Sequence, residues 1–157
     1  MAENGARRIR LGMVGGGTGA FIGYVHRIAA RIDDDYELVA GALSSRPDVA
    51  RESGRNIGLA EDRIYTSYEE MARAEAARPD GIEAVSIVTP NHVHYGPAKV
   101  FLEAGIHVIC DKPITSTLED ARRLASIKPA KGAKFLLTHN YTGYPLVRQA
   151  RELVESG

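Results

Sequence analysis

The chain has one cysteine, no tryptophan and no excess of charge of either sign, since 20 basic residues balance 20 acidic ones among its 157. A single cysteine, Cys110, excludes an internal disulfide and a metal site built from clustered cysteines. Zero net charge gives no general attraction to nucleic acid or to an anionic membrane surface. No apolar run approaches the roughly 20 residues that a membrane-spanning helix needs. We therefore expect a cytoplasmic protein that binds no metal, nucleic acid or membrane.

What the chain does contain is a regular alternation of strand and helix patterns. Strands are predicted over residues 9–14, 36–43, 64–66, 84–89, 106–110 and 135–138. Helices are predicted over residues 21–32, 47–57 and 96–104, from Ser67 to before Pro79, after a cap at Ser116 or Thr117, and from Leu146 to the C-terminus. Such alternation forms right-handed crossovers and a parallel sheet. The predicted fold is a doubly wound α/β sheet of six strands in the order 3-2-1-4-5-6, with helices on both faces.

A glycine-rich run, residues 15–20, follows the first predicted strand and opens the first predicted helix. It fits the fingerprint G-x-G-x-x-G/A with Gly15, Gly17 and Ala20 at the fixed positions. Gly15 allows the tight turn, Gly17 lets the backbone approach a pyrophosphate, and Ala20 keeps the helix close to the sheet. The predicted cofactor contacts in this loop are Gly15, Gly17, Thr18, Gly19 and Ala20. The alternatives are a plain glycine-rich turn and the similar loop of a methyltransferase that binds S-adenosylmethionine.

Ligands of doubly wound sheets bind at the carboxyl ends of the strands. Four polar segments are predicted to follow such ends and to face one crevice: Ser44-Ser45-Arg46, Thr89-Pro90-Asn91, Asp111-Lys112-Pro113 and His139-Asn140-Tyr141. Asn91 and His94 are suited to hydrogen-bond the ribose or the carboxamide of a dinucleotide, although Asn91 is equally suited to cap the next helix. The predicted cofactor contacts from these later segments are Thr89, Pro90, Asn91, His94, Asp111, Lys112, Pro113 and Asn140.

Four motifs in this order resemble those of the Gfo/Idh/MocA oxidoreductases, the glucose–fructose oxidoreductase and inositol dehydrogenase family. They are the glycine loop, Thr89-Pro90-Asn91-His92-Val93-His94, Gly105-Ile106-His107-Val108 and Asp111-Lys112-Pro113. The resemblance covers nearly the whole chain, and Asp111 stands where the family usually has Glu. It implies an N-terminal Rossmann domain and reversible hydride transfer between a nicotinamide cofactor and a sugar, cyclitol or related polyol. It also implies that the peptide bond before Pro113 is often cis.

Lys112 is the predicted catalytic residue, because the family places its equivalent lysine beside the nicotinamide. Oxidation of a carbinol requires removal of the hydroxyl proton and stabilisation of the developing carbonyl oxygen, and a partly desolvated lysine can do both. The alternative is an exposed lysine in a loop between a strand and a helix.

The end of the second predicted strand bears on the choice between NADP and NAD. An NAD enzyme normally has Asp or Glu there to accept from the ribose 2′-hydroxyl. This chain instead has Ser44, Ser45 and Arg46, which suit a 2′-phosphate. We predict NADP as the favoured cofactor, with NAD as the second choice. The alternative is that Ser45 only caps the next helix while Arg46 faces solvent.

The resemblance further implies a division of the chain into residues 1–142, the dinucleotide-binding domain, and residues 143–157, a helix that leads towards an absent α+β substrate domain. We therefore expect this fragment to be inactive alone, and the full-length protein to be a homo-oligomer that acts on a small sugar or polyol. The alternative function is a non-catalytic dinucleotide-binding sensor or regulatory module.

Overall fold

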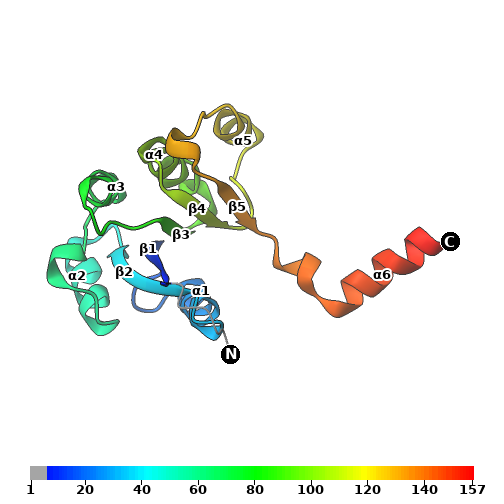
Figure 1. Cartoon of the computed structure of the whole chain (residues 1–157), viewed down its shortest axis with the longest axis horizontal. Coiled ribbons are helices and arrows are strands. Elements are labelled where there is room, and N and C mark those ends of the chain that lie inside the picture. The colour runs from blue at the N-terminus through cyan, green and yellow to red at the C-terminus, as the bar shows by residue number, and fades with distance from the viewer. Residues whose placement is uncertain (1–6) are drawn as a thin grey trace.

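A five-stranded sheet, in which every neighbouring pair of strands is parallel, forms the centre of the computed structural model, which describes residues 7–157. The strands are β1 (Ile9–Gly15), β2 (Tyr36–Ala42), β3 (Ala84–Val88), β4 (His107–Asp111) and β5 (Phe135–Thr138). The helices are α1 (Phe21–Ile32), α2 (Pro47–Asn56), α3 (Tyr68–Ala77), α4 (Tyr95–Ala104), α5 (Leu118–Ala125) and α6 (Pro145–Ser156). The strand order β2-β1-β3-β4-β5 confirms the doubly wound α/β class (Figure 1).

The predicted strand at residues 64–66 does not form, so the sheet has five strands instead of the six expected. Ile64 makes one parallel bridge to Gly41 of β2, which keeps the segment beside β2, where the predicted order places it. A 3₁₀ turn at Glu61–Arg63 comes directly before this segment, and Ser67 caps α3 directly after it. Too few residues remain between the two to build a ladder of hydrogen bonds.

A buried carboxylate holds the same segment in place instead. Glu75 of α3 is 1% exposed, and its side chain forms a salt bridge with Arg63. The hydroxyl of Tyr65 donates to Glu75 at 2.8 Å, and the backbone N–H of Ile82 donates to it at 3.0 Å. Because buried charge is stable only when it is paired and hydrogen-bonded, these partners fasten α3 to the chain on both sides of it.

The helices begin and end largely where the sequence indicates. Thr117 is the cap of α5, since its hydroxyl accepts from the backbone N–H of Asp120 at 3.1 Å. Gly105 ends α4 in the left-handed conformation, with φ +82°. The next N–H, of Ile106, then donates to Phe101 in α4, so β4 begins at His107, one residue later than expected.

The two faces of the sheet are packed unequally. A larger core joins α3, α4 and α5 to the sheet, and a smaller one lies on the side of α1 and α2, as the separation of α4 and α5 from α1 in Figure 1 illustrates. The larger core includes Met71, Ile87, Phe101, Val108 and Leu124. The smaller core is built from Met13, Leu43, Leu59 and Val88. Right-handed crossovers explain why the helices divide between the two faces. The chain adds strands in one direction across the sheet up to α2 and in the opposite direction afterwards, so the later helices lie on the other face.

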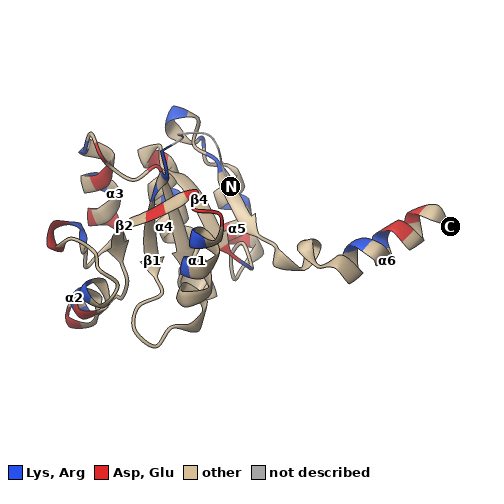
Figure 2. Ribbon diagram, turned by 60° about the horizontal axis from the view of Figure 1, so that its bottom comes forward, with Lys and Arg blue, Asp and Glu red and all other residues tan. Residues whose placement is uncertain are grey.

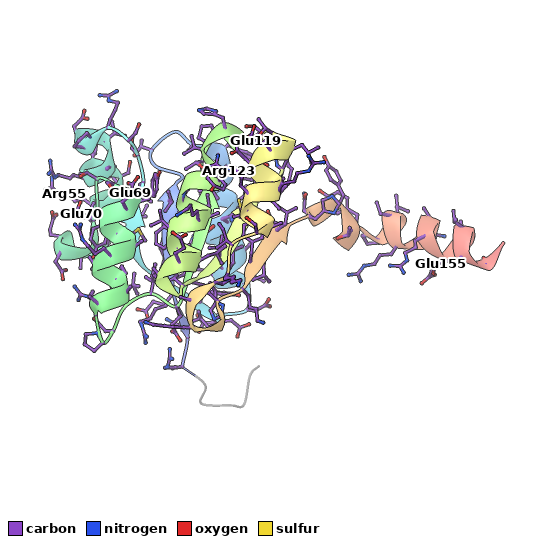
Figure 3. The ribbon with its side chains drawn as sticks, turned by 90° about the horizontal axis from the view of Figure 1, so that it is seen from above. Arg55, Glu69, Glu70, Glu119, Arg123 and Glu155 are labelled. Carbon is purple, nitrogen blue, oxygen red and sulfur yellow. The ribbon has the colours of Figure 1, made fainter. Side chains whose placement is uncertain are left out.

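Helix α6 extends away from the rest of the molecule (Figures 1 and 3, where Glu155 marks its outer turn). No side chain of α6 is buried among residues 7–157, and Leu146, Leu153 and Val154 of its apolar stripe are all more than half exposed. Charged residues lie along α2, α3 and α6 (Figure 2). Across the same residues, no helix is both long and apolar enough to cross a membrane.

We expect Phe101→Ala to lower the free energy of unfolding by about 3–5 kcal/mol, because Phe101 is fully buried in the larger core and its loss leaves a cavity. Urea denaturation followed by circular dichroism measures the change. Leu153→Ala is the matched control: Leu153 is 64% exposed on α6, so this variant should stay within about 0.5 kcal/mol of the parent. Equal losses in both variants would contradict this packing.

Candidate functional site

At Gly16 and Gly17 the loop between β1 and α1 lies so close to its neighbours that a side chain is excluded. Gly16 has φ +74°, and a Cβ on it would lie 2.8 Å from the Cα of Gly23 in α1. A Cβ on Gly17 would lie 2.7 Å from the carbonyl oxygen of Leu43, which accepts from the Gly17 N–H at 3.1 Å. The loop and Phe21 at the start of α1 line open clefts, so backbone N–H groups of the loop and of the first turn of α1 can meet a ligand there.

Two side chains from the flanking helices fix this loop, and neither was identified from the sequence. Ser53 of α2 accepts from the backbone N–H of Thr18 at 2.9 Å, and Arg27 of α1 donates to the carbonyl of Gly16 at 2.8 Å. Gly23 was missed as well. A glycine inside a helical pattern is the one signal that could have found it, because such a glycine usually marks close packing.

A cleft of about 600 Å³ runs along the carboxyl ends of β1, β2 and β3. The predicted residues that line it are Gly15, Gly17, Thr18, Ala20, Ser44, Ser45, Thr89 and Pro90. Unpredicted residues also line it, among them Thr66, Tyr68, Glu69 and His92. Gly19 lines an adjoining hollow of about 310 Å³ beside the same loop.

Thr89 carries the clearest sign that this cleft accepts a polar ligand. Its Oγ1 is a buried side-chain atom that has no hydrogen-bond partner among residues 7–157. A buried hydroxyl without a partner costs free energy, and rotation of the Thr89 side chain toward the cleft that it lines would let a bound ligand supply the missing bond.

The end of β2 presents two hydroxyls to the cleft, those of Ser44 and Ser45, whereas Arg46 is exposed and lies outside the residues that line it. Ser45 is exposed there, while the Ser44 hydroxyl accepts from the backbone N–H of Arg46 at 3.1 Å. Arg46, not Ser45, is the N-cap of α2, and no side chain caps that helix. The guanidinium of Arg46 donates to Asp48 at 2.8 Å, and this bond lowers the pKa of the Asp48 carboxyl. The pair is exposed, so it is weak enough for Arg46 to exchange partners.

A second cleft, of about 350 Å³, lies on the α1 side of the sheet. It brings together three predicted residues, Asp111, Lys112 and Asn140, beside an apolar wall from α1. Lys112 is exposed, and the peptide bond between it and Pro113 is cis, as the resemblance implied. Cys110, on the opposite side of β4, is fully buried, and burial raises the pKa of its thiol to about 12, so it is not a nucleophile.

His94 differs from the prediction that it contacts the cofactor. Its ring is fully buried, with Nδ1 2.8 Å from the carbonyl oxygen of Pro113 and Nε2 3.0 Å from that of Thr89. The side chain therefore joins the loop after β3 to the loop after β4 and is not free for a ligand. Asn91 is exposed in a 3₁₀ turn and lies outside the residues that line the two clefts, and its side chain caps no helix.

Residues 9–141 match the sequence model of a family described as an oxidoreductase family with an NAD-binding Rossmann fold. The D-xylose 1-dehydrogenase (NADP⁺) of Hypocrea jecorina is 36% identical over a match that covers 82% of this chain and 32% of that protein.

Two solved structures resemble this chain over 97% of its length. An oxidoreductase from Sinorhizobium meliloti has 65% identity and a TM-score of 0.88, with 42% of its own chain covered. An inositol dehydrogenase homologue from Azotobacter vinelandii, complexed with NAD⁺, has 44% identity and a TM-score of 0.89, with 39% covered. The present chain thus spans about two fifths of the length of these solved chains, and of a curated relative, the oxidoreductase YfiI of Bacillus subtilis.

We expect Gly17→Ala to weaken NADPH binding by about tenfold or more, equivalent to about 1.4 kcal/mol, because the new Cβ must push the loop away from Leu43. Fluorescence titration measures the affinity. Gly143→Ala serves as the control, since a Cβ at Gly143 meets no heavy atom within 4 Å. An unchanged affinity in Gly17→Ala would show that the loop does not hold the dinucleotide.

Proposed function

The chain belongs to the Gfo/Idh/MocA oxidoreductase family, and on that premise we propose that it holds a nicotinamide dinucleotide for hydride transfer to or from a sugar, cyclitol or related polyol. The observation that carries the proposal is the cleft that joins the glycine loop to the ends of β2 and β3, with the unpartnered Thr89 hydroxyl buried in its wall. When bound, the cofactor supplies the hydride donor or acceptor.

The two clefts support an orientation for the dinucleotide. The larger one ends at Ser44 and Ser45, where an adenosine 2′-substituent would meet hydroxyls. The smaller one contains Lys112, at the end of β4. Strand β3 pairs with both β1 and β4 and contributes residues to both clefts. The glycine loop, which follows β1, can then receive the pyrophosphate that joins the adenosine end of the dinucleotide to its nicotinamide end.

Lys112 is proposed to act on the oxygen of the reacting alcohol. Its ammonium can donate a hydrogen bond to the developing carbonyl oxygen, and the neutral amine can accept the hydroxyl proton. His94 supports this placement by binding the carbonyl of Pro113, the residue after Lys112, so the direction of the loop is set from inside the protein.

Because Lys112 is exposed to solvent, catalysis needs a further part of the protein to cover it. Residues 7–157 leave the cleft beside Lys112 open on one side, and an open site lets water weaken every electrostatic contact in it. We propose that residues 143–157 lead towards a further, α+β domain that closes this side and contacts the substrate. The relatives with inositol or xylose in their names are about two and a half to three times as long as the matched region, which supports this division.

The cofactor is proposed to be NADP, with NAD binding more weakly, because Ser44, Ser45 and Arg46 present no carboxylate to a 2′-phosphate. Thermal shift and titration with NADP⁺, NAD⁺ and S-adenosylmethionine test the function, since a ligand that binds only the folded protein raises its melting temperature. Arg46→Ala should weaken NADP⁺ binding selectively, by about 1.5–3 kcal/mol for one charge-assisted contact.

Arg55→Ala is the matched control for Arg46, because Arg55 lies farther along α2 and pairs with Glu61 at 2.7 Å (Figure 3). It should leave both dinucleotide affinities unchanged. Stabilisation by S-adenosylmethionine alone would refute the dinucleotide site. Equal NADP⁺ and NAD⁺ affinities that Arg46→Ala does not alter would refute the 2′-phosphate contact and leave the dinucleotide site intact.

Lys112→Ala should lower turnover by about 10²–10⁴-fold, the usual scale for a lost proton-transfer residue, with little effect on dinucleotide affinity. The assay measures the oxidation of a panel of sugars and cyclitols by a form of the protein that has measurable dehydrogenase activity. Lys99→Ala is the control, since Lys99 pairs with Glu103 on α4 at 2.5 Å and lines neither cleft. Full activity in Lys112→Ala would remove this lysine from the mechanism.

A further inference from the structure

Four polar side chains from four different elements form a connected row on the α1 side of the sheet, next to Lys112. Nδ1 of His26, in α1, lies 2.8 Å from the hydroxyl of Ser86 in β3. Nε2 of the same ring lies 3.7 Å from Oδ1 of Asp111 in β4. The hydroxyl of Thr138 in β5 donates to the same Oδ1 at 2.9 Å. The row places an imidazole and a carboxylate side by side where the proposed nicotinamide end of the crevice lies.

Both members of the central pair are shielded from water. The side chain of His26 is 12% exposed and that of Asp111 is 16% exposed. The cleft around them has an apolar wall that includes Ile22, Val25 and Ile109. Because both side chains are mostly buried, water screens the interaction between their charges less than it would at the surface of the protein.

Burial and Asp111 act on His26 in opposite directions. Burial lowers the pKa of His26 below its ordinary value, and the carboxylate of Asp111 opposes this without overcoming it. The other titratable groups that line the cleft are Tyr36 of β2 and Lys112 after β4. On α1 itself, Arg27 is held away by its bond to Gly16. The protonation state of His26 therefore depends on whether another positive charge also interacts with the carboxylate of Asp111.

We propose that His26 takes up a proton from water when the nicotinamide ring beside Asp111 changes from its oxidised, cationic form to its reduced, neutral form. This rests on the proposed function, which puts that ring at Lys112. The cationic ring and a protonated His26 both draw on the carboxylate of Asp111, and they repel each other. Reduction of a bound cofactor would remove the positive charge of its nicotinamide, and Asp111 would then be free to stabilise the imidazolium of His26.

The proton count of the reaction stays balanced. Oxidation of the alcohol breaks its C–H bond, with the electron pair leaving as hydride, and its O–H bond, whose proton passes to Lys112 and then to water. His26 binds one proton from that water through Nε2, the nitrogen that faces Asp111. Reduced cofactor is thereby retained more firmly at low pH than oxidised cofactor, through a residue that touches neither substrate nor hydride.

The test is the pH dependence of dinucleotide binding to the purified chain. Dissociation constants are measured for NADP⁺ and NADPH, or for NAD⁺ and NADH if these bind more tightly, from about pH 8 to about pH 5, where histidine titrates. The dissociation constant of the oxidised dinucleotide, divided by that of the reduced one, should rise about fivefold as the pH falls. Nuclear magnetic resonance of the His26 ring should show protonation at a higher pH in the reduced complex.

His26→Gln should make the ratio independent of pH, since it removes the titrating ring, and Asp111→Asn should weaken the pH dependence, since it removes the carboxylate that interacts with both cations. His107→Gln is the control and should keep the dependence, because His107 begins β4 at its other end and its Nδ1 accepts from Lys134. If a variant does not fold, the proposal is tested by the pH titration of the His26 ring in the oxidised and reduced complexes of the parent chain.

A pH-independent ratio in the parent, or one that stays pH-dependent in His26→Gln, overturns the role of His26 while the dinucleotide site stands. Equal titration of the His26 ring in the oxidised and reduced complexes does the same. If neither dinucleotide raises the melting temperature or binds in titration, the proposed function fails, and the role of His26 fails with it.

Discussion

The contact of the β1–α1 loop with its neighbours is the constraint on which the rest of the site depends. Backbone, not side chain, meets backbone there: Gly17 donates to Leu43 at the end of β2, and Gly16 lies against Gly23 of α1. A side chain at Gly16 would push against α1, and one at Gly17 would push against the end of β2. Since β2 leads to Ser45 and α1 carries His26, these two close backbone contacts help to position both ends of the crevice.

The unequal packing of the two faces explains where the polar residues stand. The face covered by α3, α4 and α5 holds the larger apolar core, and burial of that core contributes more to stability than burial of the smaller one. The α1 face has only a small apolar cluster, so side chains such as Ser86, His26 and Asp111 can point to that side without displacing a core residue. The groups available for chemistry therefore gather on the face that contributes less to folding.

Features that depend on a few neighbouring residues could be predicted from the sequence. The glycine loop, the caps at Ser67 and Thr117, and the strand order all follow from local spacing and from the handedness of crossovers. The segment at residues 64–66 was assigned wrongly because its apolar pattern is that of a strand. Its place is determined by the Glu75 carboxylate, a partner about ten residues away that a local pattern does not show.

The amino-acid sequence by itself determined the fold class, the position of the dinucleotide loop and the set of polar segments at the strand ends, because backbone geometry and strand direction impose these locally. Only the tertiary structure decided what each polar side chain does. His94 looks like a ligand-binding residue in the sequence, yet both its ring nitrogens face carbonyls of the protein. His26 looks like an ordinary helix residue, yet it lies beside Asp111, 85 positions later in the chain. A hydrogen bond depends on atoms within a few ångströms, and in a parallel sheet those atoms come from strands that are distant in sequence.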